Sequence, residues 1–279
     1  MQVRANEGQL NASRFDRLSP LLRHRALLWQ FIQRNVELRH KGSHLGLIWS
    51  FLNPLLMLGL YVLVFGQFFQ AKSPTEDTTT YALSIFIGLS IFHFLSEVLG
   101  TSPATIVANP SFVKKVVFPL EILPVANVGA AFVHFLISVG LTLIGIAAFG
   151  PGLDLGVLWL PVIFLPFLLL TLGVGWAAAA IGVFFRDINQ FTGFLSMALM
   201  FASAIFYPAA MIVERSKAAW LVLQFNPLIH AIELSRDAAL RHRPIDLAHL
   251  GYLYVVGLAV AALGYWIFRK LRPAFADVL

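Results

Sequence analysis

Residues 156–185 read GVLWLPVIFLPFLLLTLGVGWAAAAIGVFF and contain no charged side chain. A helix needs about 20 apolar residues to cross the hydrocarbon core of a bilayer, so this stretch is long enough to span it. The whole chain of 279 residues is 58% hydrophobic and 12% charged, and that charged fraction is about half of what a soluble domain carries. Lipid must therefore cover most of its surface, and we expect an all-α membrane protein.

Five other apolar stretches occur along the chain, and each is also long enough to cross a bilayer. Together they predict six transmembrane helices, at about residues 45–69, 81–101, 120–149, 156–185, 188–208 and 247–268. Asn53-Pro54 lies inside the first helix and should kink it, because proline has no N–H to donate to the preceding turn. The connections are mostly short, so residues 1–279 are expected to form a single transmembrane domain.

Three segments outside these spans have a different character. Residues 21–41 form a basic amphipathic helix with aromatic side chains, a type that lies in the plane of the membrane interface. Residues 209–245 are semi-polar, and their two apolar pieces are too short to cross the membrane. We expect a pair of short re-entrant helices there, buried by other parts of the protein. Residues 102–119 form a short basic connection between the second and third spans.

The distribution of lysine and arginine predicts the orientation. With both termini in the cytoplasm, 14 of the 20 basic residues lie on the inner side and 6 on the outer side, as the positive-inside rule requires. Residues 102–119 are then cytoplasmic and residues 209–245 periplasmic. Six spans hardly enclose a wide pore, so a symmetric homodimer is expected. The absence of cysteine excludes disulfides, thiolate metal sites and cysteine nucleophiles.

The cytoplasmic connection contains the sequence ANPSFVKKVVFP over residues 108–119. An asparagine cap and a proline in the first turn favour a short helix. Two apolar side chains would fill a groove on a soluble partner, and two lysines would bind its acidic groups or lipid phosphate. We call this segment the coupling helix, because it would couple the partner to the membrane helices. Its cap, proline, two apolar residues and two lysines are Asn109, Pro110, Phe112, Val113, Lys114 and Lys115. The alternative is a plain loop whose lysines only set the topology.

Aromatic residues are abundant, with 25 Phe, 6 Trp and 6 Tyr. Aromatic rings stack on the flat C–H faces of sugars and leave the hydroxyl groups in water, so a sugar polymer can slide along a row of them. The candidates on the first and fifth spans are Trp49, Tyr61, Phe65, Phe191, Phe194, Phe201, Phe206 and Tyr207. The alternative for each ring is contact with lipid or packing in the core.

His93 and Glu97 lie four residues apart on the second span and share a helix face. A charge at mid-bilayer costs about 2.5–3.5 kcal/mol on insertion scales, so such residues usually face protein or water. They are candidates for a proton relay or a catalytic pair. The alternative is a polar contact at the membrane edge or with the interface helix. His134 in the third span is expected to be a buried, hydrogen-bonded histidine.

Small residues recur along the fourth span. Gly175 and Ala179 lie four apart, as do Ala178 and Gly182, and Gly173 precedes them. Small faces let membrane helices approach closely, so this pattern predicts tight packing against another helix.

Five stretches resemble the permease subunits of type-2 ABC exporters, and in particular the branch that exports O-antigen, capsule and teichoic-acid polymers. The first is RHKGSHLGLIWSFLNPL over residues 39–55, where His40 stands in place of the tyrosine more common in the family. The others are residues 109–125, 185–188, 225–228 with Arg236, and 272–277. The resemblance extends over nearly the whole chain in order.

The resemblance implies a homodimer bound to two separate ATPase subunits in a bacterial inner membrane. It implies that residues 102–119 and the N-terminal helix contact the ATPase, that the first and fifth spans line the polymer path, and that residues 209–245 form periplasmic re-entrant helices. The chain has no Gly-x-x-x-x-Gly-Lys-Ser/Thr phosphate loop, so ATP and Mg²⁺ would bind to the partner. We expect no cofactor, metal or catalytic residue in this chain, and no nucleic-acid partner.

Further charged residues are expected to act at the cytoplasmic side. The turn Arg186-Asp187 is a candidate second contact for the ATPase, and the alternative is an exposed ion pair that contributes little. The expected ATPase contacts outside the coupling helix are Arg34, Glu37, Arg39, Arg186 and Asp187. The expected binding residues for the phosphate of a lipid-linked polymer are Arg23, Arg25, Arg39 and Lys41. The expected function is export of a lipid-linked polysaccharide, with O-antigen as the first candidate.

Four alternatives stay open at this point. The same permease fold could export capsule or teichoic acid, or a small molecule or lipid. His93 and Glu97 could instead belong to a membrane-embedded transferase. A non-catalytic scaffold would have no ATPase partner.

Overall fold

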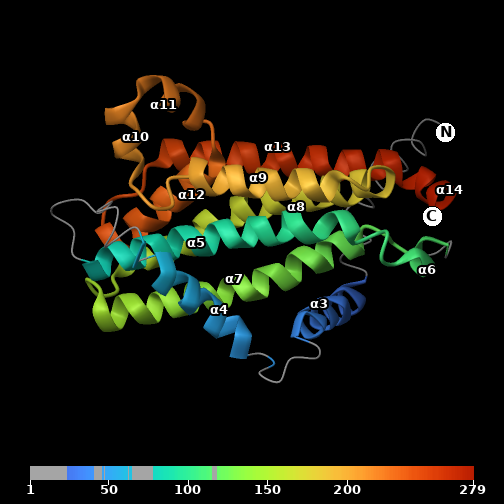
Figure 1. The fold of residues 1–279 in the computed structure, drawn as a ribbon, viewed down its shortest axis with the longest axis horizontal. Coiled ribbons are helices and arrows are strands. Elements are labelled where there is room, and N and C mark those ends of the chain that lie inside the picture. The colour runs from blue at the N-terminus through green and yellow to red at the C-terminus, as the bar shows by residue number, and fades with distance from the viewer. Residues whose placement is uncertain (1–23, 41–45, 47, 62, 65–77, 115–117) are drawn as a thin grey trace, which may run out of the picture.

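The computed structural model describes residues 24–40, 46, 48–61, 63–64, 78–114 and 118–279, and every regular element in these ranges is a helix (Figure 1). Four of them are long and apolar enough to cross a membrane. They are α5 (Thr78–Thr101), α7 (Ile122–Phe149), α8 (Leu160–Phe184) and α13 (Leu247–Leu271). The second, third, fourth and sixth predicted spans are therefore confirmed as apolar helices of spanning length.

The other two predicted spans are shorter helices. Helix α4 (Ile48–Tyr61) contains Pro54, as expected, and residues 65–69 of the predicted range lie outside the described residues. Helix α9 (Ile188–Ala202) ends at Ala202 rather than at residue 208. Its end has a physical cause, because Ala204 adopts a positive φ of 52° and cannot continue a right-handed helix. The predicted boundary at 208 was therefore wrong.

The remaining elements are short and lie between or beyond the long helices. Helix α3 (Arg25–His40) corresponds to the predicted interface helix. The others are η2 (Ser102–Ala104), α6 (Pro110–Val113), η3 (Leu155–Trp159), α10 (Ala209–Arg215), α11 (Lys217–Leu223), α12 (Pro227–Arg236), the π-helical η4 (Asp237–Arg241), η5 (Arg272–Ala274) and α14 (Phe275–Val278).

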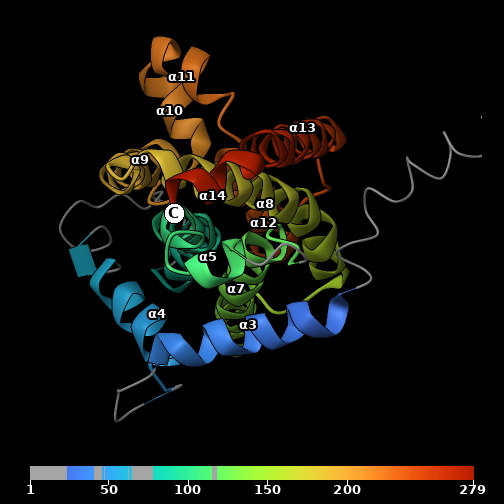
Figure 2. The ribbon, with the colours of Figure 1, turned by 90° about the vertical axis from the view of Figure 1, so that its right-hand side faces the viewer.

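Several short elements gather at the two ends of the bundle. Helices α3, α6 and α14 lie towards one end, and α10 and α11 lie at the other (Figure 1). Figure 2, which looks along the long helices, shows α3 running across them beneath α7. A helix that lies across the bundle at one end has the placement expected for the plane of a membrane interface.

Helix α5 forms the centre of the fold. It contacts α7, α8, α9 and α12, and its residues are apolar around nearly the whole circumference (Figure 2). A helix that is hydrophobic on all sides is stable only when other helices surround it. Phe94 anchors this core, with its ring centroid 5.2 Å from that of Phe135 and 6.1 Å from that of Phe167.

The small residues of α8 pack against backbone, as predicted. A Cβ atom added to Gly173 would lie 2.2 Å from the carbonyl oxygen of Val260 in α13, and one added to Gly264 would lie 2.0 Å from that of Gly173. Gly182 approaches the carbonyl of Pro103 equally closely, at 2.2 Å. Helices α8 and α13 make the most extensive helix–helix contact among the described residues. This close approach makes the α8–α13 pair a rigid seam.

Candidate functional site

Helix α9 carries an exposed aromatic face. Phe191, Phe194 and Phe201 are 61%, 71% and 51% exposed, and they lie on one side of the helix because an α-helix turns about 100° per residue. The opposite side faces α5 and α8, and Thr192 is the one buried residue in α9. In a membrane, this face needs lipid, a sugar chain or another protein surface as its cover.

The other predicted channel aromatics have different surroundings. Trp49 on α4 is 39% exposed, and the hydroxyl of Tyr207 donates to the carbonyl of Phe201 at 2.6 Å. Phe206 is only 1% exposed and accepts the hydroxyl of Tyr81 at its carbonyl oxygen, so it is a core residue and not part of the α9 face. Phe65 and the side chain of Tyr61 lie outside the described residues.

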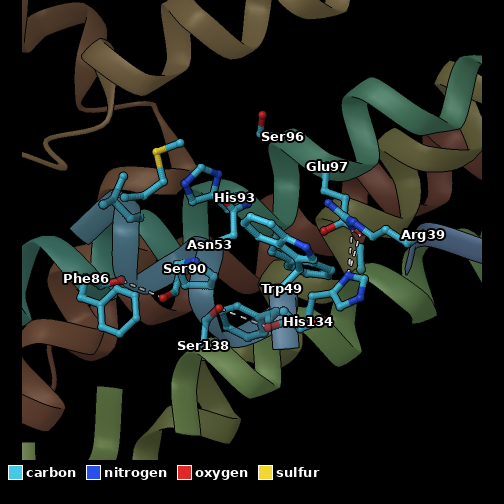
Figure 3. Close-up of a pocket in the computed structure, with 17 residues that line it drawn as sticks. Arg39, Trp49, Asn53, Phe86, Ser90, His93, Ser96, Glu97, His134 and Ser138 are labelled. Carbon is cyan, nitrogen blue, oxygen red and sulfur yellow. Dashed lines mark hydrogen bonds and ion pairs between the residues drawn. The ribbon is translucent and has the colours of Figure 1, made fainter. Parts of the chain in front are cut away.

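A cavity of about 580 Å³, here called the α4 pocket, separates α4 from α5 and α7 (Figure 3). Its apolar wall includes Trp49 and Phe86, and its polar groups include Asn53, Ser90 and His93. Figure 3 shows Arg39, Glu97 and His134 gathered at one end, where the C-terminus of α3 reaches the pocket. The pocket therefore combines aromatic and hydrogen-bonding groups beside a helix that packs loosely.

Three ionisable side chains from three helices meet in the α4 pocket. Arg39 of α3 forms an ion pair with Glu97 of α5. Nη1 of Arg39 lies 3.0 Å from Nδ1 of His134 in α7, which is 3.1 Å from Oε1 of Glu97. This is the polar contact between Glu97 and the interface helix that the sequence left as an alternative. His134 is half-buried and hydrogen-bonded, as expected. The cluster ties α3 to the bundle.

His93 lies one turn from Glu97 on α5 and faces the same pocket, as the spacing predicted. Its side chain is exposed, and its ring centroid lies 5.5 Å from that of Phe92. The ion pair of Glu97 is with Arg39. The geometry therefore favours a structural role for Glu97.

The predicted coupling helix is the single turn of α6. It begins at Pro110 with Asn109 in the cap position, as predicted, but the Asn109 side chain donates to the carbonyl of Thr105 at 2.9 Å and makes no capping bond. The Phe112 ring lies 5.5 Å from Phe31 of α3 and stacks on Phe118 at 4.6 Å. These ring contacts join α6 to α3.

The other residues predicted to contact an ATPase are placed as follows. Val113 is half-buried beside Phe112. The exposed ones at this end are Lys114 on α6, Arg34, Glu37 and Arg39 on α3, and Arg186 and Asp187 in the turn between α8 and α9 (Figure 1). Arg25, a predicted phosphate contact, is exposed at the start of α3. Arg23, Lys41 and Lys115 lie outside the described residues.

From the sequence, Arg236 was noted only as part of the family resemblance, and its burial and hydrogen bonds were not predicted. Its side chain is 1% exposed. The guanidinium donates to the carbonyls of Ser84 in α5 at 3.3 Å, Ala204 at 2.8 Å and Ile205 at 2.6 Å. Arg236 therefore fastens the irregular segment after α9 to α5 and α12.

Glu233 extends this network to the surface. Its carboxylate accepts from Arg236 at 2.8 Å and from Arg241 at 2.7 Å, and Arg241 also donates to Asp237 at 3.0 Å. Burial alone would favour the neutral carboxyl, but the charges of both guanidinium groups hold the pKa of Glu233 below its usual value. The sequence contained a signal for this network, because Arg236 and Arg241 follow Glu233 by three and eight residues, and Arg241 follows Asp237 by four. These spacings place side chains on one face of a helix.

With this geometry described, comparison with known proteins identifies the class. Residues 26–240 match the model of the ABC-2 type transporter family, and the chain belongs to that family. It is therefore a membrane protein of ABC transporter permease type, and the resemblance stated from the sequence is confirmed.

Curated relatives of this chain include polysaccharide exporters. The chain is 30% identical over 257 residues to the O-antigen export system permease protein RfbA of Myxococcus xanthus, covering 92% of this chain and 96% of the relative. It is 28% identical over 254 residues to the protein of the same name from Klebsiella pneumoniae, covering 91% and 95%. The polysialic acid transport protein KpsM of Escherichia coli is 25% identical over 243 residues, covering 86% and 92%.

Proposed function

We propose that this chain is the membrane subunit of an ATP-driven exporter that moves a lipid-linked polysaccharide across the bacterial inner membrane, with lipopolysaccharide O-antigen as the first candidate. The observation that carries the proposal is the alignment with O-antigen export permeases over 91% and 92% of the chain. The exposed aromatic face of α9 supports a sugar polymer as the substrate.

The motor is a separate chain in this proposal. The sequence contains no phosphate loop, so two ATP-binding subunits would bind ATP and Mg²⁺ and act on a homodimer of this permease. They would press on α6, and the aromatic contacts between Phe112 and Phe31 would pass the displacement to α3. The ion pair of Arg39 with Glu97 would pass it on to α5.

The polymer path would run between two copies of the chain, with both termini of each copy in the cytoplasm. Phe191, Phe194 and Phe201 would face it from α9, and Trp49 from α4. Rings spaced along a helix offer repeated weak contacts, so no single site holds the polymer. Arg25 would meet the phosphate of the lipid carrier, since Arg39 is already paired with Glu97.

A capsular polymer is the second candidate. It is favoured by the similarity to polysialic acid transport proteins over 86% of the chain. The same path would serve either polymer, because aromatic rings contact sugar faces whatever the repeat unit.

The proposal is tested by expressing the chain in a host whose own O-antigen permease has been deleted. Surface polysaccharide is measured by gel and by antibody, with the chain alone, with its ATPase, and with an ATPase whose phosphate-loop lysine is changed. Surface polymer should appear only with the active pair. Export without ATP hydrolysis, or a failure of the chain to assemble with any ATPase, contradicts the proposal.

The coupling role has a separate test. Val113→Asp should abolish export while the permease stays at normal level in the membrane. Phe112→Asp should do the same, but it also breaks a ring stack within the chain, so Val113 gives the cleaner result. Normal export by a Val113→Asp variant would remove α6 from the coupling path.

A further inference from the structure

A second cavity lies at the end of the bundle opposite α3 and α6. It has a volume of about 800 Å³ and is lined by residues of α10, α11, α12, η4 and the start of α13, and we call it the α10–α13 cleft. Ligand pockets in proteins usually measure about 300–1,000 Å³, so this cleft has the size of a binding site. Its aromatic and charged lining residues are Trp220, His230, Glu233, Asp237, Arg241, Arg243, Asp246 and His249.

One part of the cleft is built from aromatic rings. The rings of His230 and His249 stack with centroids 4.8 Å apart, and the ring of Tyr252 lies edge-on to His230 at the same distance. A hydrogen bond fixes the orientation of the His230 ring, because its Nε2 lies 2.7 Å from the carbonyl oxygen of Gln224. Trp220 lines the cleft from α11. Flat ring surfaces in fixed positions suit the C–H faces of sugars.

Glu233, Asp237, Arg241 and Asp246 of the cleft are paired within the chain, and the exposed Arg243 adds a positive charge to its lining. Glu233 accepts from Arg241 and from the buried Arg236, and it also accepts the backbone N–H of Ala209 at the start of α10. Asp246 lies 3.0 Å from Nδ1 of His249. The three carboxylates Glu233, Asp237 and Asp246 are balanced by Arg236, Arg241 and Arg243, so no strong net charge is left for a phosphate or a polyanion.

Paired carboxylates and guanidinium groups still offer acceptors and donors to hydroxyls. A carboxylate has about four lone-pair sites and arginine has five N–H donors, so the pairs in the cleft do not exhaust them. The cleft therefore combines aromatic surfaces with hydrogen-bonding groups and little net charge. This combination fits an uncharged ligand rich in hydroxyl groups.

We propose that the α10–α13 cleft binds uncharged sugar residues of the exported polymer after they leave the membrane path. The inference rests on the proposed function, since it assumes that this end of the bundle faces the periplasm. Trp220 and His249 stack on sugar faces, and Glu233 and Arg241 bind hydroxyl groups. Binding at this end favours onward movement, because a captured segment does not slide back.

The test measures binding to the purified permease–ATPase complex without nucleotide. The probe is a set of oligosaccharides released by mild acid from the polymer that accumulates on cells expressing the active pair, and its affinity is followed by equilibrium dialysis. Trp220→Ala should weaken binding about tenfold and Trp220→Phe much less, because phenylalanine keeps a ring face. Leu221→Ala is the matched control, since Leu221 is the adjacent residue on α11 and is 65% exposed.

The outcomes separate this inference from the proposed function. Binding by the wild type and by Leu221→Ala, lost in Trp220→Ala and not displaced by inorganic phosphate, supports it. Absence of binding while cells still export, an equal loss in both variants, or displacement by phosphate overturns it and leaves the proposed function standing. Failure of export with an assembled, ATP-hydrolysing complex contradicts the proposed function itself.

Discussion

Two groups of helices in this chain are held in different ways. The frame, defined here as α5, α8, α12 and α13, is fixed by backbone-to-backbone contact along the α8–α13 seam and by the buried Arg236. Three elements outside the frame, α3, α4 and α9, are here called the lightly held elements, and they expose large apolar side chains. Helices α4 and α9 make few contacts with the frame, whereas α3 packs along α7, which is not part of the frame. A pocket of about 580 Å³ even separates α4 from α5 and α7.

This difference indicates which parts of the permease move. A seam in which a Cβ atom would lie 2.0 Å from a carbonyl oxygen cannot slide without losing its packing. Short helices with exposed faces have fewer contacts to break, and local motion is expected where contact density is low. We infer that transport displaces α3, α4 and α9 against a frame that stays fixed.

Replacing Arg236 should have the largest effect on stability, because this buried guanidinium joins α5, α12 and the segment after α9. Arg236→Met leaves the carbonyls of Ser84, Ala204 and Ile205 without their donor, and the expected loss of stability is about 3–5 kcal/mol. Thermal unfolding in detergent measures it. Arg243→Met is the control, since Arg243 is exposed. Similar unfolding temperatures for the two variants would show that Arg236 does not hold the frame.

The α8–α13 seam should tolerate no added carbon. In Gly264→Ala, the new Cβ would meet the carbonyl of Gly173, so the helices must separate, at a cost of about 1–3 kcal/mol. Gly251→Ala on the same helix is the matched control, because nothing lies within 4 Å of its added Cβ. Unfolding temperature and yield from the membrane are compared. Equal stability of both variants would contradict a rigid seam.

On the lightly held side, a substitution should change transport and not stability. Phe194→Ala removes the most exposed ring of α9, which makes few contacts in the fold. If the proposed path is right, export should slow about fivefold, as expected for losing one aromatic contact of about 1 kcal/mol. Phe149→Ala, at the end of α7 and 77% exposed, controls for loss of a surface ring. Export unchanged by Phe194→Ala would remove this face from the path.

The frame was largely predictable from the sequence. The second, fourth and sixth spans, which form α5, α8 and α13 of the frame, are recognised because their apolar runs are continuous, and the small residues on the fourth indicated close packing. The bounds of α5 and α13 differ by three residues from those predicted, at Thr78 and Leu271. The position and length of these helices follow from local apolar runs alone, so they can be predicted without knowing which helices pack together.

The site was less predictable, because its contacts join residues far apart in the chain. Arg39 was assigned to an ATPase and to lipid phosphate, and both assignments stay predictions. Its pairing with Glu97 corresponds to the alternative that placed Glu97 against the interface helix, where the sequence did not identify the partner residue. Phe206 was assigned to the channel, but the turn at Ala204 places it in the core. No local sequence pattern predicts that Arg236 donates hydrogen bonds to the backbone carbonyls of this turn.

Removing the ion pair between Arg39 and Glu97 should have the smallest effect on stability. It also tests directly how α3, one of the lightly held elements, is joined to α5 of the frame. The Arg39 side chain is 46% exposed, so the pair should contribute only up to about 1 kcal/mol. Arg39→Gln should barely change the unfolding temperature but should speed hydrogen exchange along α3, because its link to α5 is lost. Arg25→Gln, exposed at the other end of α3, should leave exchange unchanged. If Glu97→Gln speeds exchange by the same factor and the double variant adds nothing further, the two residues act as one link; additive effects would mean that α3 is held elsewhere.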